Sequence, residues 1–429
     1  MGNNFTHTDI CMKARRARQE FDDRNFPTAY RMFAEAFESN PKAWWLAMEA
    51  IRSIRAQRSE SIAKHIAGQI LFSPDYTTGN SYQTNLYSEA SKFGFTIEPV
   101  RDLDLQLLLS KLIFSRNKVF HQHWIKEYYW NASSFEDGVR GVQRRISILK
   151  ALKAFGIKVV WTLHNLIDHD ATDLQRKLCI YTHQEMARVS DIIYVHTRNS
   201  SNLLSEQCEL NIENKCHLLE HPLYDNISSI DGAEVPKEIN IGNLAGKKVL
   251  VHLGMIKPYK GVADLLNAFN DHVRNYPSSS LYLIIGGKVY DPAVSHALGS
   301  LGGFVRERLI LIDRRLSESE MSALLRLANI SITPYRNILI SGSYYLSTTF
   351  RKPTIAPRIG MFRELIKDGE SGILYDGTVA GLAEALRRID EMSSGHLATI
   401  GDNNYNANSH LSVNAVSDRY FTSLGVAGE

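Results

Sequence analysis

Apolar residues change their spacing along this chain near residue 69. Before that point they recur at helical intervals, as Ala17, Phe21, Ala29 and Phe33 do, and this period predicts two antiparallel helices. After it, short apolar runs such as KVFHQHW and IKVVWTLHN alternate with segments of helical period. Runs that are apolar on both faces are typical of parallel strands covered by helices. The pattern therefore predicts a small helical region followed by an α/β fold.

The alternation of strands and helices occurs twice, which predicts two doubly wound domains. A polar stretch over 225–245 precedes a second series of runs that includes KKVLVHLG and LYLIIGG. The 429 residues also exceed what one compact core usually holds. We expect a helical extension over 1–68, a first domain over 69–225, a second over 226–406 and a C-terminal helix within 407–429. The extension resembles a single tetratricopeptide repeat, which either packs on the rest of the chain or binds a protein partner.

The net charge of the chain indicates which classes of ligand it can bind. A net charge of +3, spread over separate basic segments, does not predict nucleic-acid binding and leaves phosphate-bearing small molecules or an anionic membrane open. In the helix predicted around residue 146, Val142, Ile146 and Leu149 share the face expected to pack on the sheet. Four basic side chains project elsewhere and could meet anionic headgroups: Arg140, Arg144, Lys150 and Lys153. The alternative is a solvated charged surface.

Cysteine spacing and hydropathy bear on the cellular compartment. The four cysteines, Cys11, Cys179, Cys208 and Cys216, show no CxxC or zinc-like spacing, as expected in a reducing compartment. No apolar run reaches the ~20 residues needed to span a bilayer, and the N-terminus is polar. We expect a cytoplasmic protein, either free or peripheral on the cytosolic face of the inner membrane.

Chemistry-bearing side chains follow the predicted strands of the first domain. The run VVWTLHNLIDHD, residues 159–170, passes from apolar residues to a polar group of five: His164, Asn165, Asp168, His169 and Asp170. The run KVFHQHW ends in His123 and Trp124. Ligands of open α/β sheets bind at the carboxyl ends of the strands, so these residues are site candidates. The alternatives are a histidine satisfied inside the core and a tryptophan that only packs.

Two loops of the second domain carry groups that suit phosphate. LVHLGMIKPYKG places Gly254, Lys257 and Lys260 between a strand and a helix. PYRNILISGSYYL places a second set before the next helix: Arg336, Ser341, Gly342 and Ser343. Ammonium groups and the N–H groups of a helix N-terminus both attract anions, so both loops are candidate phosphate sites. The alternatives are solvated lysines and an ordinary helix cap.

These segments, in their order along the chain, resemble the GT-B glycosyltransferases. The segments are HQHW, KVVWTLHN, SDIIYVHT, LGMIKPYKG, SGSYYL, RKPTIAP, IGMFREL and DGESGILY, and the resemblance extends over 69–425. The chain looks most like glycosyltransferase family 4 and its relatives in bacterial exopolysaccharide and capsule assembly. The resemblance implies two Rossmann-like domains that face a cleft, with a C-terminal helix that crosses back to the first. It implies that a sugar passes from a nucleotide-diphosphate donor on the second domain to a glycan or lipid-linked acceptor on the first, without a cofactor or metal.

The resemblance also implies roles for residues. His164 is the implied catalytic residue that faces the donor sugar, with Asp170 as a candidate base. The implied donor side comprises Gly79, Asn80, Gly254, Lys257, Lys260, Arg336, Ser341, Gly342, Ser343 and Glu364. The acceptor-side candidates are His123, Trp124, Asn165 and His169.

The chain departs from family 4 at two places. The family usually carries two glutamates near the second phosphate helix, but Ile338 and Leu346 occupy the corresponding positions, and Glu364 is the nearest carboxylate. Met255 stands where an arginine often follows the strand glycine, and Lys257 is the candidate substitute. The donor and the stereochemistry are therefore open. The resemblance favours retention, in which the departing phosphate deprotonates the acceptor, whereas inversion needs a carboxylate base, Asp170 before Asp168.

Two other functions are open at the level of sequence. A nucleotide-sugar epimerase of GT-B fold would need acid and base carboxylates at the donor sugar and no acceptor site. A catalytically weak scaffold protein would act through its N-terminal helices, and its missing glutamates would reflect lost activity. Release of nucleotide diphosphate with and without an acceptor distinguishes these functions from glycosyl transfer.

Overall fold

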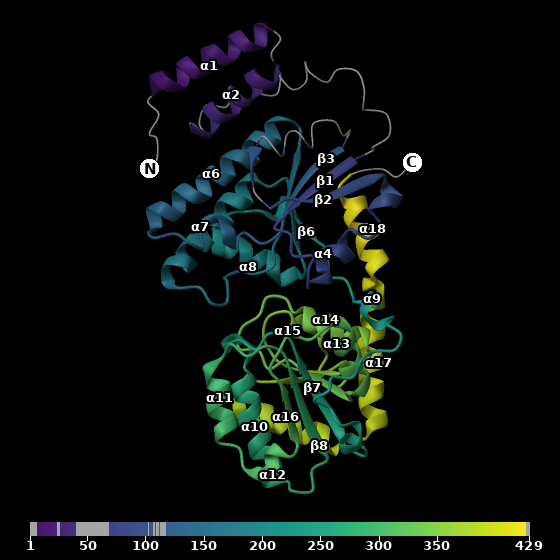
Figure 1. Cartoon of the computed structure of the whole chain (residues 1–429). Helices are drawn as coiled ribbons and strands as arrows, with labels where there is room; N and C mark the ends of the chain where they lie inside the picture. The colour runs from purple at the N-terminus through teal and green to yellow at the C-terminus, as the bar shows by residue number, and fades with distance from the viewer. Residues whose placement is uncertain are drawn as a thin grey trace. The chain divides into compact units, whose positions relative to one another are not determined.

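The described chain forms two compact units (Figure 1). The first unit comprises the described residues up to Leu219 together with those from Ser417, and the second is Glu220–Val416. Each unit contains one six-stranded sheet whose strands are all parallel, which confirms the predicted α/β class. The computed structural model describes residues 7–23, 26–39, 68–101, 103–105, 108, 111 and 117–425.

The sheet of the first unit has the strand order β2-β1-β3-β4-β5-β6. Its strands are β1 (Gly68–Ser73), β2 (Phe95–Pro99), β3 (Asn117–Gln122), β4 (Lys158–Thr162), β5 (Ile192–Val195) and β6 (Cys216–Leu218). The central strands are buried on both faces: Phe120, Val159, Val160 and Trp161 are at most 1% exposed. β-branched and aromatic residues suit such a doubly covered strand. Because the strands are parallel, all their carboxyl ends lie at one edge of the sheet.

Helices cover both faces of this sheet (Figure 1). The helices are α4 (Ser81–Leu86), α6 (Phe135–Ala154), α7 (Asp173–Val189) and α8 (Arg198–Cys208), with short 3-10 helices over Ala90–Phe93, Lys126–Tyr128 and Glu213–Lys215. α6 begins after Ser134, whose hydroxyl accepts a hydrogen bond from the Asp137 N–H at 3.2 Å. Val142, Ile146 and Leu149 on α6 are fully buried, which confirms the inward face predicted for this helix.

The sheet of the second unit has the order β12-β11-β10-β7-β8-β9. Its strands are β7 (Lys248–Leu253), β8 (Leu281–Gly286), β9 (Leu309–Ile312), β10 (Ile330–Ile332), β11 (Thr354–Pro357) and β12 (Ile373–Tyr375). Its helices are α9 (Asp225–Ser228), α10 (Val262–Asn275), α11 (Pro292–Gly299), α12 (Gly303–Arg306), α13 (Glu318–Leu327), α14 (Gly342–Thr349), α15 (Phe362–Leu365), α16 (Val379–Glu391) and α17 (Ser394–Asn408). Short 3-10 helices span Ile241–Leu244, Pro258–Lys260 and Ser409–Leu411. Leu265, Phe269 and Leu283 lie in the core between this sheet and α10.

A helix lies near each end of the described part of the chain. At the N-terminal end, α1 (His7–Asp22) and α2 (Phe26–Ser39) pack on each other and bury Ala17 and Phe33. Residues 40–67 lie outside the described part, so an extension over 1–68 and its likeness to a tetratricopeptide repeat stay predictions. At the other end, α18 (Val413–Ser423) begins in the second unit and continues from Ser417 in the first. No helix in the described part of the chain is long and apolar enough to cross a membrane.

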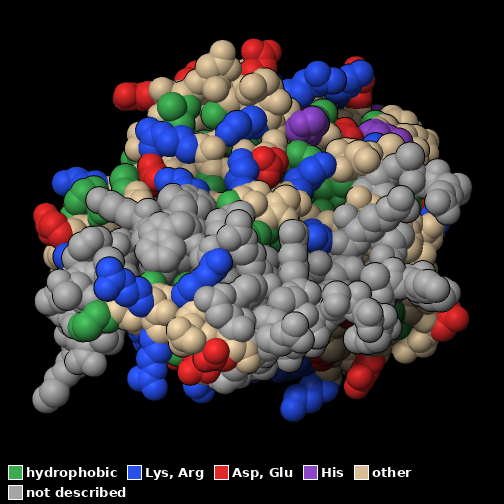
Figure 2. Space-filling view, turned by 90° about the horizontal axis from the view of Figure 1, so that it is seen from above, with side chains coloured by type: hydrophobic (Ala, Val, Ile, Leu, Met, Phe, Trp, Pro, Cys, Tyr) green, Lys and Arg blue, Asp and Glu red, His purple; other side chains and the backbone are tan. Residues whose placement is uncertain are grey.

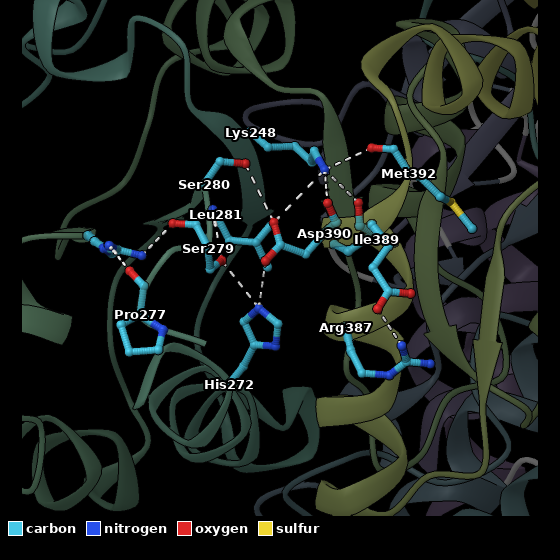
Figure 3. Close-up of polar contacts among 12 residues, drawn as sticks. Lys248, His272, Pro277, Ser279, Ser280, Leu281, Arg387, Ile389, Asp390 and Met392 are labelled. Atoms are coloured by element: carbon cyan, nitrogen blue, oxygen red, sulfur yellow. Dashed lines mark hydrogen bonds and ion pairs between the residues drawn. The ribbon is translucent and has the colours of Figure 1, made fainter. Parts of the chain in front are cut away.

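A buried lysine joins three elements at the amino end of β7 (Figure 3). The Lys248 ammonium donates to three carbonyl oxygens at the C-terminal end of α16, at 2.8 Å (Ile389), 2.6 Å (Asp390) and 2.8 Å (Met392). The Asp390 carboxylate in turn lies 3.1 Å from His272 Nε2 on α10. A cation at a helix C-terminus satisfies carbonyls that have no partner within the helix. This network therefore fixes α16 and α10 at the sheet edge opposite the carboxyl ends of the strands.

Candidate active site

Two histidines meet at the carboxyl edge of the first-unit sheet. His123 directly follows β3 and His164 lies two residues after β4, so the pairing of these strands brings both imidazoles together. His123 Nδ1 lies 3.2 Å from His164 Nε2. The Trp124 indole stacks on the His164 ring, with centroids 4.0 Å apart and planes 13° apart. Both imidazoles are buried, at 1% and 6% exposed. The structure thus brings together candidates that come from two separate runs of the sequence.

A small cavity lies beside this cluster. Its volume is ≈ 20 Å³, room for about one water molecule, and Asn165 and Asp168 line it together with the two histidines and the tryptophan. The Asp168 carboxylate accepts a hydrogen bond from the Tyr129 hydroxyl at 2.6 Å. Asp170 is exposed, and neither it nor His169 is part of the cavity wall. Of the two carboxylates predicted as alternative bases, Asp168 is therefore the one that lies at the cluster.

The loop between β1 and α4 is held by its own side chains. Gly79 has φ +86°, a left-handed conformation that favours glycine. The Asn80 side chain caps α4 by accepting a hydrogen bond from the Tyr82 N–H at 3.1 Å. Gln83 on α4 binds the beginning of the loop, since its amide donates to Pro74 O and accepts from the Tyr76 N–H, each at 2.8 Å. Gly79 and Asn80 thus belong to an ordered loop at the same edge of the sheet as His123 and His164.

In the second unit, two side chains converge on Gly254 directly after β7. A Cβ built on this glycine would lie 3.7 Å from both Lys260 Nζ and Ser343 Oγ. Its φ of +118° also favours glycine. Lys260 Nζ donates to the Tyr335 hydroxyl at 2.6 Å, and Tyr335 donates to Ser343 Oγ at 3.3 Å. The Ser343 hydroxyl donates to Leu253 O at 3.2 Å, so the chain of hydrogen bonds ends on β7.

The Lys260 ammonium is stabilised in its charged form. Burial opposes this charge, but the phenol oxygens of Tyr335 and Tyr259 outweigh burial and raise the pKa of Lys260. Burial likewise raises the pKa of Tyr335, but the ammonium outweighs it and lowers that pKa. Lys260 Nζ also lies 4.3 Å from the Tyr335 ring centroid, a cation–π distance. Sequence reasoning missed Tyr335; its only signal was its position after β10, directly before Arg336.

The N-terminus of α14 forms the other side of this site. The Ser341 hydroxyl caps the helix by accepting a hydrogen bond from the Tyr344 N–H at 3.3 Å. Because the Ser343 hydroxyl donates to a carbonyl and the Tyr344 N–H to Ser341, an anion here would bind the backbone N–H groups of Gly342 and Ser343. A Cβ on Gly342 would lie 2.8 Å from the Tyr224 hydroxyl oxygen, so only glycine lets this phenol approach the helix end. Lys260 and the α14 N-terminus thus lie together beside Gly254, and their role as an anion site stays a prediction.

The remaining predicted donor residues lie in other environments. Arg336 forms a two-pronged ion pair with the Asp264 carboxylate on α10, at 2.7 and 2.8 Å. Its guanidinium is therefore already engaged with a carboxylate. Lys257 is half-buried directly before the 3-10 helix Pro258–Lys260, and Glu364 is exposed on α15. Their contribution to a donor site stays a prediction.

The positions at which the chain departs from family 4 carry uncharged side chains, two of them buried and one exposed. Ile338 and Leu346 are each 7% exposed, so both apolar side chains belong to the core of the second unit. Met255 is 58% exposed beside Gly254. Within the described ranges, no group of three or more His, Cys, Asp or Glu side chains is arranged to hold a metal ion. The independence of the reaction from metal stays a prediction.

The two units, each with a parallel sheet and candidate ligand groups at its carboxyl edge, have the GT-B fold. Residues 247–391, which lie within the second unit, match the family model described as Glycosyl transferases group 1. This segment includes Gly254, Lys260, Tyr335 and Ser343.

This chain spans about a third of the length of the curated relatives that it matches. The D-inositol 3-phosphate glycosyltransferase of Corynebacterium glutamicum is 30% identical over 135 residues, which cover 30% of this chain and 32% of the relative. The enzyme of the same name from Corynebacterium efficiens is 27% identical over 135 residues, or 31% of its length. The similarity to these relatives does not extend over the whole protein.

Solved structures match most of the chain at low identity. Anabaena Alr3699/HepE in complex with UDP aligns with a TM-score of 0.61 at 12% identity, over 84% of this chain and all of that one. An α,α-trehalose-phosphate synthase from Burkholderia xenovorans, in complex with glucose-6-phosphate, aligns with a TM-score of 0.61 at 11% identity, over 83% and 100%. At these identities the likeness establishes the fold.

Proposed function

We propose that this protein is a glycosyltransferase that moves a sugar from a nucleotide-diphosphate sugar to a hydroxyl group of its acceptor. The observation that carries the proposal is the convergence of Lys260 and the α14 N-terminus on Gly254, inside the segment that matches group 1 glycosyl transferases. A fixed ammonium and backbone N–H groups beside a residue without Cβ suit a diphosphate. They act most strongly on the leaving group, whose charge grows as the sugar departs.

UDP is the first nucleotide to test as part of the donor. The Anabaena HepE structures hold UDP or UDP-glucose, and they share the GT-B fold with this chain at 12% identity. Phosphate recognition by Lys260 and the helix N-terminus does not depend on the base, so the choice of base and sugar is a separate question. The donor requires no cofactor and no metal in this proposal, because the protein supplies positive charge at Gly254.

The first unit would bind the acceptor, with His164 at the reacting sugar. In the reaction, the bond between the sugar C1 and the β-phosphate oxygen breaks and a bond between C1 and the acceptor oxygen forms. The acceptor proton passes to an oxygen of the departing diphosphate in the retaining course, which we favour. His164 would then orient the donor sugar, and Asp168, bound to Tyr129, would not be needed as a base.

We propose a glycan or lipid-linked acceptor of bacterial polysaccharide assembly, used in the cytoplasm or at the cytosolic face of the membrane. On α6, Arg144 and Lys150 are exposed, whereas Lys153 is paired with Asp191 at 2.7 Å and Arg140 lies 3.4 Å from Asp137. On the face shown in Figure 2, Lys and Arg side chains lie interspersed with Asp and Glu. A peripheral contact would therefore depend on a few cations rather than on one large basic patch.

Calorimetric titration with UDP tests the proposal. Replacing Lys260 with Ala removes a charge-assisted contact, so UDP affinity should fall by roughly 1 to 3 kcal/mol. Lys247→Ala is the matched control, because Lys247 is exposed directly before β7, at the opposite end of the same strand. Equal affinity of Lys260→Ala and wild type would contradict the donor site. UDP release from UDP-glucose only when an acceptor is present would separate transfer from epimerisation and from a scaffold role.

A further inference from the structure

His164 is the end of a chain of buried hydrogen-bonding groups. Thr162 Oγ1 lies 2.8 Å from His121 Nε2, and His121 Nδ1 lies 2.8 Å from the Tyr87 hydroxyl. The same hydroxyl lies 2.8 Å from His123 Nε2, and His123 Nδ1 lies 3.2 Å from His164 Nε2. Thr162, His121 and His123 are at most 1% exposed. This hydrogen-bonded network begins on β4, passes through β3 and the end of α4, and returns to the loop after β4.

The single proton of Tyr87 couples the two imidazoles that bind it. A phenol can donate one hydrogen bond, and each nitrogen of a neutral imidazole is either a donor or an acceptor. Burial lowers the pKa of His121 and of His123 well below the ordinary value, so both rings are neutral at neutral pH. If Tyr87 donates to one ring, the other ring must donate to Tyr87. The protons along the whole chain therefore all point toward His164 or all point away from it.

Tyr420 on α18 selects between these two directions. Its hydroxyl lies 2.9 Å from His121 Nδ1, the nitrogen that Tyr87 also approaches. A protonated Nδ1 can share its hydrogen between two phenol oxygens, as in the three-centre bonds common in proteins. A bare Nδ1 has one lone pair in the ring plane and accepts one hydrogen bond, so the other phenol oxygen would face that lone pair at 2.8 or 2.9 Å with no hydrogen between them. The geometry therefore favours His121 Nδ1–H, which makes Tyr87 donate to His123 Nε2.

We infer that the buried chain Thr162, His121, Tyr87, His123 holds His164 in the tautomer that carries its proton on Nδ1. With its Nε2 occupied by the Tyr87 hydroxyl, His123 has its proton on Nδ1 and donates it to His164 Nε2. His164 Nε2 is then an acceptor, so the ring is neutral and its proton lies on Nδ1. Tyr87, His121 and His123 are positioning residues, because they act only through His164.

The tautomer restricts what His164 can do in catalysis, a consequence that rests on the proposed function. Nδ1 already carries a proton and Nε2 is occupied by His123, so neither nitrogen is available as a general base. His164 can offer a hydrogen bond from Nδ1 to an oxygen, as a residue that orients a sugar hydroxyl would. The base in the reaction must then be another group, which agrees with the leaving phosphate of the retaining course.

Nitrogen NMR of the full chain, labelled at histidine, tests the tautomer without any sugar donor. Protonated and bare ring nitrogens resonate in separate regions, and the His164 signals are those lost in His164→Asn. We expect a protonated Nδ1 and a bare Nε2. A protonated Nε2 on His164 in the wild-type protein would overturn the inference.

The variant Tyr87→Phe tests whether the hydrogen-bonded network controls the tautomer of His164. The ring that packs against Phe72 and His123 is kept, but the hydroxyl that couples His121 to His123 is lost, so His164 should populate both tautomers. Two tautomers of similar population would leave about half of the molecules competent, so turnover of UDP-glucose, measured as UDP release, should fall about twofold with KM unchanged. Tyr194→Phe is the control, since it removes a buried hydroxyl that is bonded to Ser423 instead. An unchanged His164 spectrum in Tyr87→Phe would overturn the inference, whereas the expected spectra in a wild-type protein that binds no nucleotide diphosphate would contradict the proposed function alone.

Discussion

Lys248→Met should destabilise the second unit without touching the candidate donor site. The thioether replaces the apolar stem of the lysine, so the substitution removes mainly the ammonium and its three bonds to carbonyl oxygens at 2.6 to 2.8 Å (Figure 3). Hydrogen bonds to a charged group contribute roughly 1.5 to 3 kcal/mol each in mutational series. The Asp390 carboxylate, which lies 3.9 Å from the ammonium, loses its cation as well.

Two effects reduce the loss in the free energy of unfolding that we expect for Lys248→Met. Burying an ammonium costs several kcal/mol, and burial accordingly lowers the pKa of Lys248 while Asp390 opposes that shift. The side chains of Lys248 and Asp390 keep 9% and 15% exposure, so water can reach part of the freed carbonyl groups. We therefore expect a loss of about 2 to 4 kcal/mol in the free energy of unfolding, the range seen when one partner of a buried polar network is removed.

Native-state hydrogen exchange is the suitable assay, because it reports the opening of α10 and α16 separately from the first unit. Amides of both helices should exchange faster in Lys248→Met, by the factor that corresponds to the lost free energy. Lys247→Met is the matched control, since this neighbouring side chain is exposed. Protection of α16 within ~0.5 kcal/mol of wild type, the usual effect of a surface substitution, would refute the assignment of Lys248 as the clamp at the C-terminal end of this helix.

Three further predictions follow. His164→Ala should lower turnover by roughly 10²-fold while UDP affinity stays unchanged; unchanged activity per folded molecule would make His164 a core residue. Arg314 holds the pKa of Glu320 at about 2, against an ordinary value of 4.5, so this carboxylate stabilises the fold above pH 4.5 and loses its contribution as pH falls toward 2. Because the Arg314 side chain is 35% exposed, Glu320→Gln should cost about 1 kcal/mol at pH 7, and urea titrations near pH 2 should show no difference from wild type. The protein should float with anionic vesicles at low salt, and charge reversal at Arg144 and Lys150 should abolish this flotation; absence of wild-type flotation rejects the membrane contact.

The sequence alone predicted the elements and the edge of each sheet at which polar groups gather. The spacing of apolar residues along the sequence indicates which side chains are buried, because residues at helical spacing share one face of a helix. A strand that is covered on both sides must be apolar throughout. Val142, Ile146 and Leu149 on α6 illustrate this, as does the doubly buried run before His164. The parallel arrangement then follows from the alternation of strands with helices, and it places the loops after β3 and β4 together.

The partners of the candidate site residues were decided by tertiary structure. Tyr420 reaches His121 across 299 positions of sequence and Tyr87 does so across 34, and no local period encodes either contact. Tyr335 binds Lys260 only because β10 pairs with β7, and Arg336, next in sequence, turns instead to Asp264. Local spacing determines which face a side chain takes, but strand order and chain crossings determine which other side chain it meets there. The tautomer of His164 and the charge of Lys260 depend on those meetings, so neither could be read from the sequence.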